Sequence, residues 1–93
     1  DEAVRLKLWQ KVFPENTPLA PDLNFEIFAK TAELTGSNIK SAALMAAYRA
    51  AAENRPVSNQ DLIEAIDFEY RRTGRVGISN ELYGAVYLGG QMG

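Results

Sequence analysis

Histidine and cysteine are both absent from this chain of 93 residues. Without an imidazole or a thiol there is no disulfide, no Cys/His zinc site, no cysteine nucleophile and no Ser-His-Asp triad. Long apolar runs are missing too, because no stretch approaches the roughly 18 consecutive residues that span a membrane. The charged start at Asp1 and Glu2 is unlike a signal peptide. The sequence therefore predicts a small cytoplasmic domain with no metal site and no membrane partner.

The chain also lacks an excess of basic charge. Ten Lys and Arg residues stand against twelve Asp and Glu residues, for a formal net charge of −2. Proteins that bind nucleic acid generally show a basic face, so we expect no nucleic-acid partner. None of the lysines, which are Lys7, Lys11, Lys30 and Lys40, follows a glycine, so the chain contains no phosphate-binding loop.

Helical periodicity is the strongest pattern that is present. Apolar residues recur at intervals of three and four up to about residue 73, and no strand-like alternation competes. The spacing predicts helices over residues 2–13, 24–34, 38–54 and 59–73, and hence an all-α fold built as a small four-helix bundle. Prolines at 14, 18 and 21 predict a stiff connector between the first two helices.

One face of each predicted helix is expected to form the core. These faces hold Val4, Leu8, Trp9, Val12 and Phe13, then Phe25, Phe28, Ala29 and Ala32, and finally Leu62, Ile63, Ile66 and Tyr70. The third helix is alanine-rich and apolar nearly all round, which predicts a central position. We expect Gly36 to end the second helix as a left-handed C-cap, and Ser37 or Asn38 to cap the third.

The character of the chain changes after Gly74. Six of its seven glycines lie in the last twenty residues. We therefore divide it into a helical unit, residues 1–74, and a Gly-rich C-terminal tail, residues 75–93. The spacing of Leu82, Tyr83, Val86 and Tyr87 predicts a short fifth helix over 79–88, capped by Ser79 or Asn80.

Candidate catalytic groups are few. The carboxylates near the start of the fourth helix and the arginines at its end are Asp61, Glu64, Asp67, Arg71, Arg72 and Arg75. Each set has the sign that the helix dipole favours at its end, so a structural role is expected rather than acid-base catalysis or nucleic-acid binding. Trp9 and the tyrosines are expected in the core. We therefore expect that the chain is not an enzyme by its own residues.

The join between the second and third predicted helices carries a resemblance to a known family. Residues 34–40 read Leu-Thr-Gly-Ser-Asn-Ile-Lys and precede the alanine run. This order is similar to the small helical C-terminal lid subdomain of AAA ATPases, which shows Ser-Gly-Ala-Asp-Leu or Gly-Asn-Ile there. Residues 5–13 resemble the first lid helix, residues 22–25 its Asp-Val-Asp-Leu entry to the second helix, and residues 58–70 the last. The resemblance covers about residues 1–73.

The resemblance implies a role at an ATP site. In the family, ATP lies between a large nucleotide-binding subdomain and the lid, so Gly36 and Ser37 would form a wall against adenine and ribose by position. Ile39 occupies the position at which other branches place a catalytic arginine, which fits the classical AAA branch. The phosphate loop, the magnesium ligands and the arginine finger belong to the large subdomain. The parent protein is then expected to hydrolyse ATP with Mg²⁺, while this fragment binds no cofactor tightly.

The same resemblance implies two partners. They are the large subdomain of the same chain and the neighbouring subunits of a homo-oligomeric ring, usually a hexamer, in which the lid moves with nucleotide state. Arg5, Ile27 and Phe68 are the interface candidates, because each is predicted to lie at the edge of a core face or away from it.

Two other functional classes remain open. A stand-alone helical module for protein-protein interaction would need the same core and would bind through the Phe68 face or through Tyr83 and Tyr87. A helix-turn-helix DNA reader is weaker, because the helix after Gly36 is alanine-rich where a recognition helix displays polar side chains.

Overall fold

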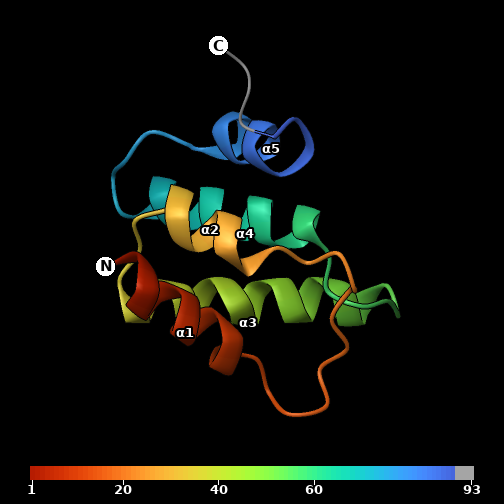
Figure 1. Cartoon of the computed structure of the whole chain (residues 1–93). Helices are drawn as coiled ribbons and strands as arrows, with labels where there is room; N and C mark the ends of the chain where they lie inside the picture. Colours follow the sequence, from red (N-terminus) through yellow and green to blue (C-terminus); the bar gives the residue numbers. More distant parts are fainter. Residues whose placement is uncertain (90–93) are drawn as a thin grey trace.

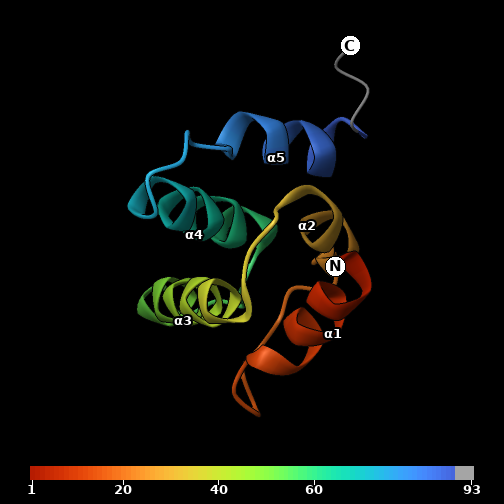
Figure 2. The ribbon, with the colours of Figure 1, turned by 90° about the vertical axis from the view of Figure 1, so that its left-hand side faces the viewer.

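The computed structural model describes residues 1–89, so residues 90–93 of the predicted tail lie outside the described part. It contains α1 (Glu2–Val12), α2 (Phe25–Thr31), α3 (Gly36–Ala52), α4 (Asn59–Arg72) and α5 (Ser79–Tyr87). Figures 1 and 2 show three tiers, with α1 and α3 in the lowest, α2 and α4 in the middle and α5 across the top. The predicted all-α fold is confirmed. None of the helices in residues 1–89 has the length and apolarity needed to cross a lipid bilayer.

The core forms where the predicted helix faces meet. Its largest fully buried apolar side chains are Trp9, Phe28, Ile39, Leu62, Ile63, Ile66, Val57 and Leu82. Alanines of α3 line the same core, and their small side chains let α1 and α4 approach the helix closely. The predicted central position of α3 is wrong, because one face of this apolar helix lies in solvent, where Leu44 and Tyr48 are 45% and 69% exposed. Tyr83 and Tyr87 also lie outside the core, about half exposed.

The predicted helix boundary before α3 is wrong as well. Helix α2 ends at Thr31, and Ala32 is already extended. The next residues alternate, with Ala32 and Leu34 buried and Glu33 and Thr35 exposed. An extended backbone is the conformation that places every second side chain in the core. Gly36 therefore does not cap α2.

Two helices end in a Schellman turn. After α4, Gly74 adopts φ +86°, its amide donates to the Arg71 carbonyl and the Arg75 amide donates to the Tyr70 carbonyl. The predicted end of this helix near residue 73 is confirmed. After α3, Asn54 takes the same role with φ +54°, so this helix ends two residues earlier than predicted.

The connector between α1 and α2 is fastened to the start of α4. Leu19 and Val57 form an isolated parallel β-bridge, in which the Ala20 amide donates to the Val57 carbonyl at 2.8 Å. The buried Asn59 side chain accepts a hydrogen bond from the Asn24 amide and donates one to the Asp22 carbonyl, both at 3.0 Å. These bonds supply hydrogen-bond partners to backbone groups of the connector, which lie outside the helices.

Helix α5 joins the same core through Ile78 and Leu82. Its predicted caps, Ser79 and Asn80, are wrong, because Ile78 occupies the N-cap position and no side chain of α5 caps the helix. Asp67 of α4 accepts hydrogen bonds from the amides of Ile78 and Ser79 instead, at 2.6 and 2.9 Å. Burial raises the pKa of Asp67, but the bonds from Arg71 and from these amides outweigh it and hold the pKa below its ordinary value.

Candidate functional site

The N-terminus of α3 is a turn fixed by a capping box. The Thr35 hydroxyl oxygen accepts a hydrogen bond from the Asn38 amide at 3.1 Å, and the Asn38 side-chain oxygen accepts one from the Thr35 amide at 3.4 Å. The N-cap is therefore Thr35, and the prediction of Ser37 or Asn38 is wrong. Asparagine stands where this motif usually has Glu or Gln.

Gly36 and Ser37 form the exposed tip of this turn. Neither of their amides finds an acceptor among residues 1–89, since they occupy the first two positions of the helix. The φ of Gly36 is not positive, and a Cβ built on it would only touch the Leu8 side chain at 3.6 Å, an ordinary contact. Neither the backbone nor the space inside the chain requires glycine at this position.

The Leu8 side chain of α1 lies beside the tip. Leu8 is 37% exposed and Val4, one turn earlier on the same helix, is 53% exposed, so the prediction that these two side chains lie in the core is wrong. The tip presents two free backbone N–H donors, with the partly exposed Leu8 side chain near Gly36. Such a surface suits one face of a flat ligand that carries hydrogen-bond acceptors.

The C-terminal end of α4 binds the turn through a hydrogen bond between Glu69 and Asn38. The Asn38 side-chain amide donates to Glu69 at 3.1 Å, and Glu69, only 3% exposed, is paired with Arg72 at 2.6 Å. The bonds from Arg72, opposed by burial and assisted by Asn38, lower the pKa of Glu69 below its ordinary value. The carboxylate is therefore charged at neutral pH and fixes which way the Asn38 amide faces.

The extended segment before the turn is also bound by residues at the end of α4 and just after it. The Glu33 amide donates to the Tyr70 hydroxyl at 2.9 Å, and Arg75 donates to the Glu33 carbonyl at 3.0 Å. The Arg75 guanidinium also lies 3.8 Å from the centre of the Tyr70 ring. Sequence reasoning did not single out Asn38, Glu69 or Tyr70 for this role. A charged residue at position 69, on the buried face of an amphipathic helix, was the available signal.

The predicted interface candidates lie in three different places. Arg5 donates through Nε to the Ala29 carbonyl at 2.8 Å, near the C-terminal end of α2, so its side chain already has a partner within the chain. Phe68 projects from α4 and is 49% exposed. Ile27 lies on α2, half-buried. The structure does not gather the three into one surface.

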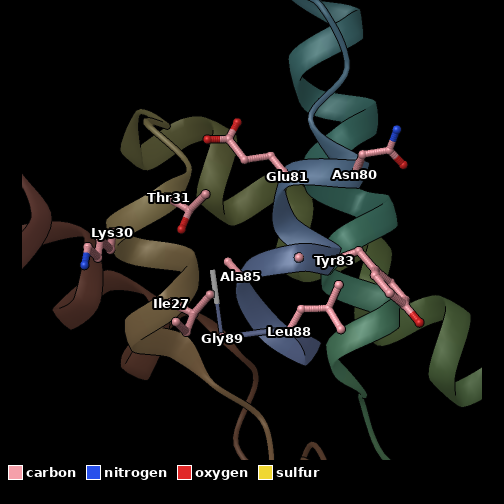
Figure 3. Close-up of a pocket in the computed structure, with 10 residues that line it drawn as sticks. Ile27, Lys30, Thr31, Asn80, Glu81, Tyr83, Ala85, Leu88 and Gly89 are labelled. Atoms are coloured by element: carbon pink, nitrogen blue, oxygen red, sulfur yellow. The ribbon is translucent and has the colours of Figure 1, made fainter. Parts of the chain in front are cut away.

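Ile27 lines a groove between α2 and α5 with a volume of about 910 Å³. Figure 3 shows Ile27 and Thr31 of α2 on one side, and Ala85 of α5 with Leu88, which follows that helix, on the other. Lys30 and Glu81 add one charge of each sign. Phe68, Gly36 and Ser37 do not contribute to its lining.

The carboxylates near the start of α4 have structural partners. Asp61 is 1% exposed and accepts hydrogen bonds from Arg55 at 2.6 and 2.8 Å and from the Ser58 amide at 2.8 Å. Burial raises the pKa of Asp61, but these bonds outweigh it and lower the pKa below its ordinary value. Within residues 1–89, no group of three side chains is suited to hold a metal ion.

Comparisons of the chain with protein families, with curated proteins and with solved structures gave no match.

Proposed function

We propose that this chain is the lid subdomain of an AAA ATPase, with Gly36 and Ser37 forming one wall of the ATP site. The proposal starts from the residues that resemble the family and is supported by the surface at the N-terminus of α3. One observation carries it above the others: Gly36 is exposed with a free amide, no feature of the described chain requires a glycine there, and the residue lies beside Leu8 of α1.

The chemistry of that surface suits adenine and ribose. An adenine ring needs an apolar face to lie on, which Leu8 offers, and acceptors on the base or sugar need donors, which the two free amides offer. A side chain larger than hydrogen at position 36 would project from the tip and keep a ligand away from the backbone. The phosphates and Mg²⁺ would be held by the large subdomain.

The ring contacts are the second part of the proposal. A lid is expected to dock on a neighbouring subunit and to transmit nucleotide state through its orientation. The α2–α5 groove with Ile27, and the exposed Phe68, are the surfaces that we assign to this docking. Arg5 takes part indirectly, because its bond to Ala29 holds α2 against α1.

A stand-alone interaction module is the second candidate. The observation that favours it is the same α2–α5 groove, which has the concave, mixed apolar and polar character of a peptide-binding site. In this case Gly36 and Ser37 would have no ligand.

Two experiments separate these functions. Reading the genomic frame upstream of the Asp1 codon is the first, and we expect it to encode a phosphate loop, an acidic magnesium site and an arginine finger. A start codon immediately before Asp1 would overturn the lid proposal.

The second experiment is an NMR titration of the ¹⁵N-labelled chain with Mg-ATP. We expect weak, millimolar binding that shifts the amides of Gly36 and Ser37, because the chain supplies only one wall of the site. Gly36→Val should abolish the shifts while the chain stays folded. Ser41→Val, an exposed change later on α3, is the matched control and should retain them. Tight magnesium-dependent binding, or no shift at Gly36 and Ser37, would contradict the proposal.

A further inference from the structure

Three side chains converge on the segment that carries Gly36 and Ser37, two from the last turn of α4 and one from the connection that follows it. Glu69 accepts a hydrogen bond from the Asn38 side chain, Tyr70 accepts one from the Glu33 amide, and Arg75 donates one to the Glu33 carbonyl. We name Glu69, Tyr70 and Arg75 the α4 clamp, and residues 33–38 the wall segment. The clamp therefore holds the wall segment on both sides of its exposed tip.

The three members of the clamp are themselves fixed. Arg72 donates two hydrogen bonds to Glu69, at 2.6 and 3.2 Å. The Arg75 guanidinium packs on the Tyr70 ring, so the two side chains bind the N–H and the C=O of the same residue as one unit. Tyr70 is 9% exposed and Glu69 3%. Side chains with fixed rotamers transmit a fixed geometry to the backbone that they bind.

The distribution of these bonds points to orientation rather than to stability alone. Burying a carboxylate is a costly way to attach a surface turn, because its desolvation offsets much of the gain from its partners. Yet all the bonds go to Glu33 and Asn38, which flank the tip, and none engages the amides of Gly36 and Ser37. The tip is held in place while its donors stay free.

We infer that Glu69, Tyr70 and Arg75 are positioning residues that set the direction in which the Gly36 and Ser37 amides meet the nucleotide. This inference rests on the proposed function. Arg75 lies in the connection between α4 and α5.

The test uses the whole chain and the Mg-ATP titration described above, at a temperature far below the unfolding midpoint. Tyr70→Phe keeps the ring and removes only the hydroxyl that accepts from Glu33. Arg75→Met keeps a long side chain over the ring and removes the donor. Each loses one hydrogen bond to the wall segment, so each should raise the Kd read from the Gly36 and Ser37 amides about threefold to tenfold. Arg75→Lys, which retains a donor and a charge, should recover most of the affinity.

Arg71→Met is the matched control. Arg71 belongs to the same end of α4, but its partner is Asp67 and not the wall segment, so its loss should leave the Kd unchanged. A purely stabilising role would lower the unfolding midpoint without changing the Kd of the folded chain. An unchanged Kd in both Tyr70→Phe and Arg75→Met, with wild-type shifts present, would overturn the inference and leave the proposed function standing. No shifts at Gly36 and Ser37 in the wild type would overturn both.

Discussion

Replacement of Asp61 by asparagine removes the charge at the centre of the largest ion cluster in the described chain. The Asp61 carboxylate is 1% exposed and binds Arg55 with both oxygens, at 2.6 and 2.8 Å, and Arg49 at 3.2 Å. It also accepts the Ser58 amide as part of the capping box of α4. Asparagine has nearly the same shape but keeps one acceptor oxygen and turns an NH₂ group toward the arginines.

The size of the expected stability loss depends on the burial of Asp61 and on the exposure of its arginine partners. Breaking a fully buried ion pair costs about 3 to 5 kcal/mol when the other charge is left without solvent. Here the side chains of Arg55 and Arg49 are 33% and 42% exposed, so the released guanidinium groups regain water. Loss of the two charge-assisted bonds and of part of the helix cap should then lower the free energy of unfolding by about 2 to 4 kcal/mol.

The assay is urea unfolding followed by far-ultraviolet circular dichroism, with thermal unfolding beside it. At this chain length, the expected loss lowers the unfolding midpoint by at least about 8 °C. Glu64→Gln is the control, because Glu64 is on the same helix and also pairs with Arg49, but both side chains are more than 40% exposed. An exposed pair of this kind contributes about 1 kcal/mol or less. Equal losses in Asp61→Asn and Glu64→Gln would refute the argument from burial.

Two further predictions concern the backbone and pH. Gly74→Ala should cost about 1 to 2 kcal/mol in urea unfolding, because φ is +86° although no atom lies within 4 Å of the added Cβ. Gly36→Ala, where φ is not positive, should cost little or nothing, and equal effects at the two glycines would contradict this. The lowered pKa values of Asp61, Asp67 and Glu69 mean that the unfolded chain binds more protons in acid. The stability that these three carboxylates contribute is complete above about pH 5 and is lost as the pH falls through their folded pKa values. The thermal unfolding midpoint should stay nearly constant from about pH 5.5 to 8.5, because no side chain of this sequence has an ordinary pKa in that range. An unfolding midpoint that rises on acidification below about pH 4 would contradict the lowered pKa values of these carboxylates.

Much of the fold could be predicted because it depends on local patterns. The buried stripe of α4, with Leu62, Ile63 and Ile66, follows from a helical period that any solvent-facing helix must obey. The end of α4 at Gly74 was predictable because few residues tolerate a positive φ. The short helix α5 was also predicted, although its cap was not, since Asp67 lies twelve residues before Ser79.

The candidate site was predictable only in part. Gly36 and Ser37 were selected by resemblance, and the structure adds the exposure and the free amides on which the proposed ligand contact depends. The role first expected for Gly36, a left-handed C-cap of α2, was wrong because Ala32 and Leu34 must alternate into the core. The support from Glu69 and Tyr70 joins residues more than 30 positions apart, which no local period encodes.

By itself, the sequence determined the helical class, the buried face of α4 and the absence of any catalytic group built on histidine or cysteine. These properties follow from the composition and from the 3.6-residue period, and both can be read from neighbouring positions in the sequence. Only the tertiary structure decided that Arg5 binds α2, that Asp61 is buried among arginines, and that the end of α4 holds the segment before α3. Those outcomes depend on which side chains the packing of helices brings within hydrogen-bond distance, and that distance is set in space rather than along the sequence.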